Sequence, residues 1–176
     1  MNLDGVTARD SKSWGWLCVG DVCVCVARRC GSTSLVTALN AGKHWRDAYP
    51  PMEAMEAKAL GLPMILGVRD PVSRFKSFWS ETQTARQWAE MRGWSPVRLL
   101  LFVKRHLHAD PHWRPQFDYY VDGVEVVRFD RLLERVGLEP RHDHKSTVPH
   151  PEVPEDEINR VYADDVFLWR LANERA

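Results

Sequence analysis

Hydrophobic and polar positions along the chain follow two patterns. Short apolar runs without a polar face, at 22–26 and 64–68, are typical of strands buried on both sides of a parallel sheet. Longer stretches repeat apolar residues three and four positions apart, as amphipathic helices do. Helices are therefore expected near 32–39, 51–60, 71–79, 95–107, 130–136 and 154–169. Strands separated by helices predict an α/β fold of three layers, with a mostly parallel central sheet flanked by helices.

Turn and cap residues predict further elements. Two strands are expected at 119–121 and 124–129, joined by a tight turn. Residues 14–19 form another strand or lead into the central one. Asp130 is expected to cap a helix that Gly137 closes.

The apolar run 22–26 leads into a basic, hydroxyl-rich turn that contains Gly31. A glycine lets the backbone turn tightly and approach a ligand closely. A helix opening at Ser32 would offer an anion its unpaired amides and the positive end of its dipole. The side chains that add charge or donors are Arg28, Arg29, Ser32, Thr33 and Ser34. The stretch predicts a phosphate-binding loop, and an ordinary strand-to-helix turn with surface arginines is the alternative.

Two known kinds of phosphate loop fit this turn less well. The spacing of a Walker loop is absent, which argues against an ATP- or GTP-hydrolysing P-loop enzyme. Cys23 and Arg29 stand six positions apart, as the thiolate and arginine of a cysteine phosphatase do. However, the residues between them continue a strand instead of forming a nest of amides, which argues against a phosphatase.

The second apolar run, 64–68, leads into Arg69-Asp70-Pro71. Together, the two stretches resemble the paired signatures of sulfotransferases that use 3′-phosphoadenosine 5′-phosphosulfate (PAPS). In that family the Gly/Ser/Thr turn holds the 5′-phosphosulfate, and an Arg-x-Pro stretch with a serine eight residues after the arginine holds the 3′-phosphate. Arg69 and Ser77 have that spacing. The resemblance covers about 16–171 and implies the P-loop-like sulfotransferase fold. The first motif ends in Ser-Thr-Ser-Leu at 32–35, which favours the carbohydrate branch of the family.

The resemblance also implies the residues of the site. Arg29 stands where the family usually has a lysine, and it takes the role of stabilising charge on the bridging oxygen of the leaving group. A guanidinium binds phosphate as a fork and an ammonium as a point charge, so this departure bears on activity more than on cofactor binding. The cofactor-binding residues are expected to be Arg28, Arg29, Cys30, Gly31, Ser32, Thr33, Ser34, Arg69, Ser77, Lys145 and Ser146.

Sulfuryl transfer to a hydroxyl also needs a general base. His44 lies between the two cofactor motifs, where some carbohydrate sulfotransferases place a catalytic histidine. His112 begins a His-aromatic-x-Pro-Gln segment that resembles one in the family. A surface histidine and a structural histidine are the respective alternatives, and Asp47 and Glu53 also share the interval of His44.

Two other histidines have a simpler explanation. His106 and His108 lie late in an expected helix, where the negative end of its dipole favours them without catalysis.

Composition limits the class of protein. The 176 residues suit one domain, expected at 14–176 after a flexible N-terminus at 1–13. Lys+Arg and Asp+Glu both number 24, so no bulk charge indicates a nucleic-acid partner. No apolar run approaches membrane-spanning length and the first residues do not resemble a signal peptide, which favours a cytoplasmic protein without a membrane partner. Since Golgi members of the family carry an anchor, a bacterial or viral origin or an excised domain is expected.

All four cysteines fall within 18–30. The two at 23 and 25 alternate with valines as small buried apolar residues would, and no Cys-x-x-Cys pair occurs. Reduced thiols and no metal site are therefore expected.

The sequence as a whole predicts an enzyme that transfers the sulfuryl group of PAPS to a hydroxyl acceptor, expected to be a saccharide, and releases adenosine 3′,5′-bisphosphate (PAP). Three alternatives stay open. They are a nucleotide- or phosphate-binding module of the same fold without catalysis, a P-loop-like kinase, and a structural or interaction protein. The oligomeric state and the identity of the acceptor are not indicated.

Overall fold

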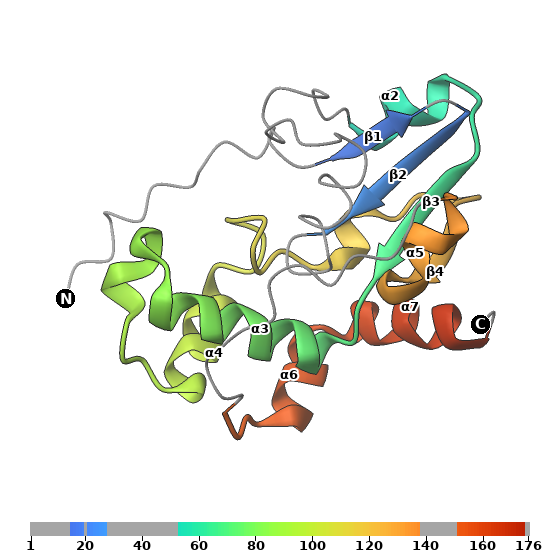
Figure 1. Cartoon of the computed structure of the whole chain (residues 1–176). Coiled ribbons are helices and arrows are strands. Elements are labelled where there is room, and N and C mark those ends of the chain that lie inside the picture. Colours follow the sequence, from blue (N-terminus) through green and yellow to red (C-terminus); the bar gives the residue numbers. More distant parts are fainter. Residues whose placement is uncertain (1–14, 20, 28–52, 138–150, 175–176) are drawn as a thin grey trace.

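The computed structural model describes residues 15–19, 21–27, 53–137 and 151–174, and within them a four-stranded sheet (Figure 1). The strands are β1 (Trp16–Val19), β2 (Val22–Val26), β3 (Met64–Val68) and β4 (Glu125–Arg128), in the order β1-β2-β3-β4. Strand β1 runs antiparallel to β2, whereas β2, β3 and β4 are parallel. This confirms the prediction of an α/β protein with a mostly parallel sheet flanked by helices.

The two apolar runs form the central strands of the sheet. Both faces of these strands are covered by other parts of the protein, so neither face favours polar residues. Val24 on β2 and Leu66 on β3 are buried, and every residue of β3 is buried. Gly67 lies where β3 meets helix α5 (Phe129–Arg135), and a Cβ atom there would come within 2.8 Å of the Leu132 side chain. The strand and the helix can therefore approach closely at this glycine.

The other helices of the described residues are α2 (Ala54–Ala59), α3 (Pro71–Thr84), α4 (Pro96–Arg105), α6 (Glu155–Val161) and α7 (Ala163–Glu174), with short 3-10 helices η3 (Arg86–Met91) and η4 (Gln116–Tyr119). Two predicted helix starts are confirmed. The Asp70 carboxylate accepts from the Ser73 N–H at 2.7 Å, and the Ser95 hydroxyl accepts from the Arg98 N–H at 3.2 Å. A proline follows each cap at the first helical position, where its missing N–H costs nothing.

Three predicted elements differ from the structure. The strand expected at 119–121 is wrong, because its first residue ends η4 and the next two lie outside any element. The helix expected at 154–169 is two helices that break at Tyr162, whose buried hydroxyl donates to the carbonyl of Trp113 at 2.7 Å. Asp130 lies inside the first turn of α5 and pairs with Arg128 at 2.6 Å instead of capping the helix.

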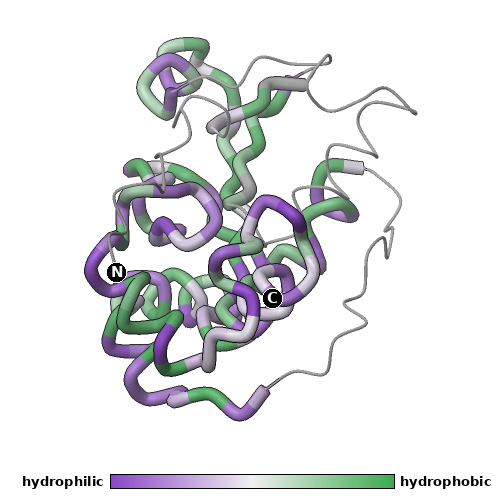
Figure 2. Tube along the Cα trace, turned by 90° about the vertical axis from the view of Figure 1, so that its left-hand side faces the viewer, coloured by the Kyte–Doolittle hydropathy of each residue, from purple (hydrophilic) through white to green (hydrophobic). Residues whose placement is uncertain are grey.

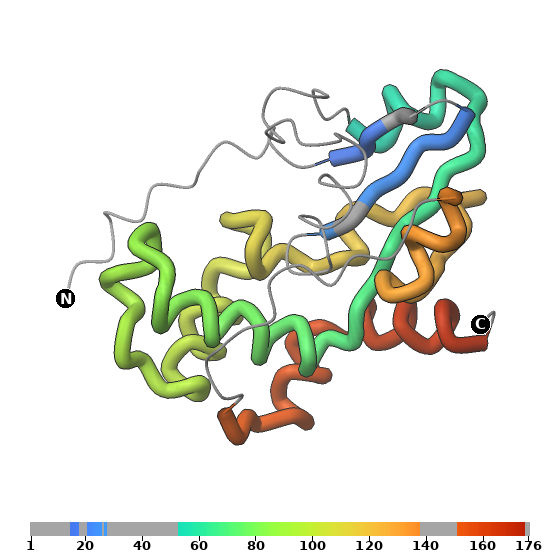
Figure 3. The backbone as a smooth tube through the Cα atoms, viewed as in Figure 1, coloured from blue at the N-terminus to red at the C-terminus, as the bar shows by residue number. Residues whose placement is uncertain are grey.

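The buried residues form two clusters. One surrounds the sheet, where α5 and α7 pack against β3 and β4, and α2 packs against β1. The other lies among α3, α4 and α6 and is rich in aromatic rings. Figure 2 shows apolar residues in green along the tube, and Figure 3 follows β3 directly into α3, which leads from the first cluster to the second. The segment 69–77 therefore lies where the two clusters meet.

Candidate functional site

Three of the predicted site residues lie in the described part of the chain: Arg69, Ser77 and His112. The others lie outside the described residues: Arg28, Arg29, Cys30, Gly31, Ser32, Thr33, Ser34, His44, Lys145 and Ser146. The described part of the site consists of these three residues and of the residues that contact them.

The two strands that precede the cofactor motifs end at the same edge of the sheet. Strands β2 and β3 are parallel neighbours, and Val26 pairs with Gly67. Arg69 follows β3 by one residue, at the carboxyl edge where open α/β sheets bind their ligands. Ser77 belongs to the same strand–helix unit, two turns along α3, and is half-buried.

The main chain of Arg69 is held by the side chain of Gln116, which is fully buried. The Arg69 N–H donates to Gln116 Oε1 at 2.8 Å, and Gln116 Nε2 donates to the Arg69 carbonyl at 2.8 Å. The guanidinium lies 5.3 Å from the centre of the Phe129 ring, in a cation–π contact. Arg69 is thus fixed at its backbone and supported along its side chain.

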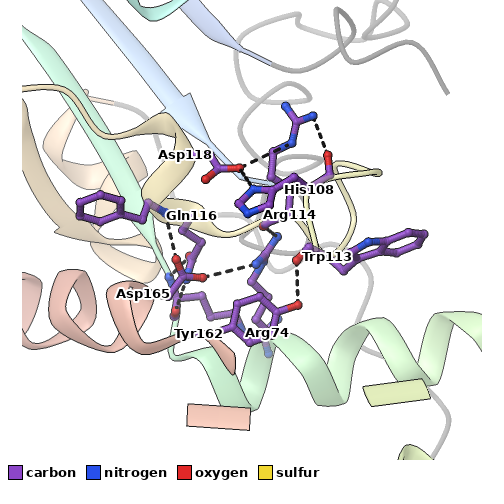
Figure 4. Close-up of polar contacts among 10 residues, drawn as sticks. Arg74, His108, Trp113, Arg114, Gln116, Asp118, Tyr162 and Asp165 are labelled. Carbon is purple, nitrogen blue, oxygen red and sulfur yellow. Dashed lines mark hydrogen bonds and ion pairs between the residues drawn. The ribbon is translucent and has the colours of Figure 1, made fainter. Parts of the chain in front are cut away.

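Gln116 also contacts a buried ion pair of Arg74 and Asp165 (Figure 4). The Arg74 side chain, on α3, donates through Nη2 to the Arg114 carbonyl at 2.7 Å, and its Nη1 lies 3.6 Å from Asp165 Oδ2. The other carboxylate oxygen of Asp165 accepts from the Phe117 N–H at 2.9 Å, and Oδ2 accepts from Gln116 Nε2 at 3.3 Å. The network therefore joins α3, η4 and α7.

Burial sets the protonation of the carboxyl in this network. Loss of hydration raises the pKa of Asp165 above its usual range, while Arg74 and the hydrogen bonds from Gln116 and Phe117 act in the opposite direction. The desolvation effect is the largest of these. The charge of Arg74 is the largest of the effects that favour the ionised carboxylate.

His112 lies in the aromatic cluster and is buried. Its Nδ1 lies 2.6 Å from Asp110 Oδ1, which also accepts from the His112 N–H at 2.8 Å. The ring of Trp88 is 5.0 Å away, edge to face, and Nε2 has no hydrogen-bond partner among the described residues. The ring packs against Phe75 and Phe78 of α3 and leaves no room there for a water molecule. This environment is that of a structural histidine, and the catalytic role of His112 stays a prediction.

An exposed histidine–carboxylate pair lies on the other side of Gln116 along η4 (Figure 4). His108 Nδ1 is 2.7 Å from Asp118 Oδ2, and the imidazole side chain is 66 % exposed. Arg114 donates to the His108 carbonyl at 3.0 Å, and its Nε lies 3.8 Å from Asp118 Oδ2. A carboxylate on Nδ1 orients an imidazole and leaves Nε2 to take a proton from solvent or a ligand.

This pair lies near the edge of the sheet that carries Arg69. Tyr119, which ends η4 next to Asp118, is buried in the cluster that contains Cys25 of β2, and this burial raises its pKa to about 12. Arg114 and Asp118 also act on the same phenol. The 3-10 helix thus lies against the end of β2 through Tyr119 and against the end of β3 through Gln116.

The sequence did not single out Gln116, Asp165 or the His108–Asp118 pair as site residues. Gln116 appeared only as the last residue of the segment that resembles the sulfotransferases. Asp165 follows it by 49 residues, and Asp118 follows His108 by ten. No periodicity connects such positions, so only the folded chain brings them together.

The cysteine prediction needs one correction. Cys23 is disulfide-bonded, so the expectation that all four thiols are reduced is wrong for this residue. Cys25 is buried and does not belong to a disulfide, as expected. Among the residues that the structure describes, no group of three or more His, Cys, Asp or Glu side chains could hold a metal ion. No helix in the described ranges is both long enough and apolar enough to span a membrane.

Comparison of the chain with protein-family models, with curated proteins and with solved structures gives no match. The function is therefore inferred from the resemblance of the two motifs and from the geometry of the residues around Arg69.

Proposed function

We propose that this protein is a PAPS-dependent sulfotransferase that transfers the sulfuryl group to a hydroxyl acceptor, with a saccharide as the expected class. One observation supports the proposal most. Strands β2 and β3, which precede the two cofactor motifs, are parallel neighbours, and Arg69 follows the second of them at the ligand-binding edge. A nucleotide with two separate phosphates suits two such motifs at one edge.

In the proposed reaction the acceptor oxygen attacks sulfur in line with the bond to the bridging oxygen. The acceptor proton passes to a base, the bond between sulfur and the bridging oxygen breaks, and PAP leaves with the negative charge. Arg29 and the turn at 30–34 are assigned to that charge, and Arg69 and Ser77 to the 3′-phosphate. Arg28 adds charge at the turn, and Lys145 and Ser146 are assigned to closing over the nucleotide. No metal takes part.

The binding step is tested with PAP and an arginine variant. Arg69→Ala is expected to raise the Kd for PAP about 100-fold, because a charge-assisted contact to phosphate is worth about 1.5–3 kcal/mol. The Kd for AMP, which lacks the 3′-phosphate, is expected to stay unchanged. Calorimetric titration of both nucleotides measures this. The matched control is Arg131→Ala, which removes an exposed arginine that pairs with Glu134 on the surface.

Other outcomes of the same titration favour the alternatives. A preference for ATP together with ATP-dependent magnesium binding would indicate a kinase. Tight PAP binding without sulfuryl transfer would indicate a binding module of the same fold. Indifference to all nucleotides would contradict the proposal and favour a structural or interaction protein.

Three histidines are candidates for the base. His44 and His112 come from the sequence, and the geometry adds His108, whose ring is exposed and oriented by Asp118. We favour His108, since a general base must reach the acceptor proton directly or through one water molecule. His112 has its ring buried.

The base is identified by comparing His44→Gln, His108→Gln and His112→Gln. His108→Gln is expected to lower kcat about 100-fold with the Kd for PAP unchanged, because a general base contributes about 10²–10⁴ in rate. The measurement is release of PAP from PAPS in the presence of the best acceptor from a panel of saccharides. The control is Lys104→Gln, which neutralises an exposed side chain in the last turn of α4. Full turnover by His108→Gln would contradict this assignment.

We also propose a cytoplasmic location and a bacterial or viral origin. The Cys23 disulfide weighs against the location, because reducing compartments disfavour disulfides. Thiol titration of the protein purified under anaerobic conditions distinguishes a reducing from an oxidising compartment. A thiol at Cys23 supports a cytoplasmic protein, and a disulfide contradicts it.

A further inference from the structure

We propose that Gln116 is a positioning residue for nucleotide binding, which acts by fixing the main chain of Arg69. The inference rests on the proposed function, because it concerns the arginine that the function assigns to the 3′-phosphate. In this role Gln116 does not contact the nucleotide, but it affects the affinity of the site for the 3′-phosphate.

The first observation is that one side chain binds both polar groups of one peptide residue. Strand β3 ends at Val68, whose last ladder partner is Arg128 on β4. At the next residue the amide of Gln116 accepts from the Arg69 N–H and donates to the Arg69 carbonyl, both at 2.8 Å. The buried amide thus replaces the neighbouring strand at this position. Both backbone dihedrals of Arg69 are restrained, and with them the direction in which its side chain leaves the sheet.

The second observation is that the amide of Gln116 can take only one orientation. Nε2 lies 3.3 Å from Asp165 Oδ2 while it donates to the Arg69 carbonyl. A flipped amide would place its oxygen against that carbonyl and the carboxylate, and its NH₂ group against an N–H donor. All these contacts would then be repulsive. The carboxylate of Asp165 therefore fixes the amide that fixes Arg69.

The third observation is that the network returns to the strand–helix unit that contains Arg69 and Ser77. Arg74, on the first turns of α3, is 3 % exposed and pairs with Asp165. Its Nη2 also donates to the Arg114 carbonyl, two residues before Gln116. A shift of Gln116 would therefore disturb the arginine at the edge of the sheet and the start of the helix together. In metal sites, replacing a residue that orients a ligand in this way changes the affinity about 10–100-fold.

The test compares the affinities for PAP and AMP in four proteins: the wild type, Gln116→Met, Arg69→Ala and the double variant. Methionine keeps the length of the side chain and removes both hydrogen bonds to Arg69. We expect Gln116→Met to raise the Kd for PAP about tenfold and to leave the Kd for AMP unchanged. In the double variant the Kd for PAP is expected to equal that of Arg69→Ala alone, because Gln116 acts only through Arg69.

If Gln116 only stabilised the fold, its replacement would leave the ratio of the Kd for PAP to the Kd for AMP unchanged. Leu99→Ala, which removes a buried side chain from α4 in the aromatic cluster, is the control for lost stability, and its ratio is expected to match the wild type. If Gln116→Met does not fold, Gln116→Asn replaces it, since the shorter amide cannot reach both groups of Arg69 at once.

The outcomes separate the two proposals. A wild type that does not prefer PAP to AMP overturns the proposed function and this inference with it. A wild type that prefers PAP, with the same preference in the Gln116 variant, overturns this inference alone. A double variant that binds PAP markedly more weakly than Arg69→Ala would also contradict it, because Gln116 would then act by another route.

Discussion

Replacing Arg74 with methionine is expected to lower the free energy of unfolding by about 3–5 kcal/mol at neutral pH. The variant removes the guanidinium that pairs with Asp165, and both side chains are buried. The carboxylate would remain among Gln116 and the Phe117 N–H without a balancing charge. Removing one partner of a buried pair costs more than the pair itself contributes, because the other charge stays buried. Urea denaturation measures the loss.

The size of this loss is expected to depend on pH. Burial raises the pKa of Asp165 in the folded protein above that of the unfolded chain. The folded state therefore keeps the proton to a higher pH than the unfolded chain does. The contribution of this group to stability falls as the pH rises from the pKa of the unfolded chain through that of the folded protein. Arg74 lowers the same pKa, so its removal raises it further. The loss caused by Arg74→Met should thus be smaller at about pH 5 than at about pH 7.

The control for the charge is the double variant Arg74→Met/Asp165→Asn. An asparagine can keep a hydrogen bond to the Phe117 N–H without carrying a charge. We expect the double variant to recover part of the stability lost in Arg74→Met and to lose the pH dependence. An equal loss at both pH values would contradict the account, because the cost would then come from packing and not from the carboxylate.

Replacing Trp113 with alanine is expected to lower the free energy of unfolding by about 3–5 kcal/mol as well. The indole is 2 % exposed, and its ring centre lies 5.4 Å from that of Phe78 and 5.7 Å from that of Trp88. Its N–H donates to the His106 carbonyl at 2.6 Å, which the variant leaves without that donor. The loss combines a cavity in the aromatic cluster with an unpaired polar group.

The matched control for Trp113→Ala is Phe167→Ala, which removes an aromatic ring that is 58 % exposed on α7. Its effect is expected to stay within about 0.5 kcal/mol. Denaturation curves with unchanged slopes would show that the variants change stability without changing the surface exposed on unfolding. A loss below about 1 kcal/mol for Trp113→Ala would mean that the cluster collapses around the missing ring.

The parts of the fold that the sequence predicted are those with a local cause. The apolar runs 22–26 and 64–68 form strands because no polar face interrupts them, and Ser95 begins a helix because its hydroxyl binds an amide three residues later. The end of β3 and the start of α3 were predicted for the same reason. These features placed Arg69 at the edge of the sheet before any tertiary contact was considered.

The parts that were missed depend on contacts between distant segments. The residues from 116 to 119 form a 3-10 helix instead of leading into a strand, because Asp165, 48 residues later, binds the Phe117 N–H. The last helix breaks at Tyr162, and the hydroxyl of this residue binds the carbonyl of Trp113, 49 residues earlier. Hydrogen bonds of this kind leave no periodic pattern, so propensity alone predicted the wrong element.

The place of Asp165 near the end of the chain has a consequence for the protein during its synthesis. A chain that emerges from the ribosome can pair β2 with β3 and begin α3 while α7 is still unmade. During that interval the Gln116 amide lacks its hydrogen bond to Asp165, because that residue has not been added. The network behind Arg69 is therefore completed only after translation of the last helix. A nascent chain and a finished one differ in whether Asp165 orients the amide that binds Arg69.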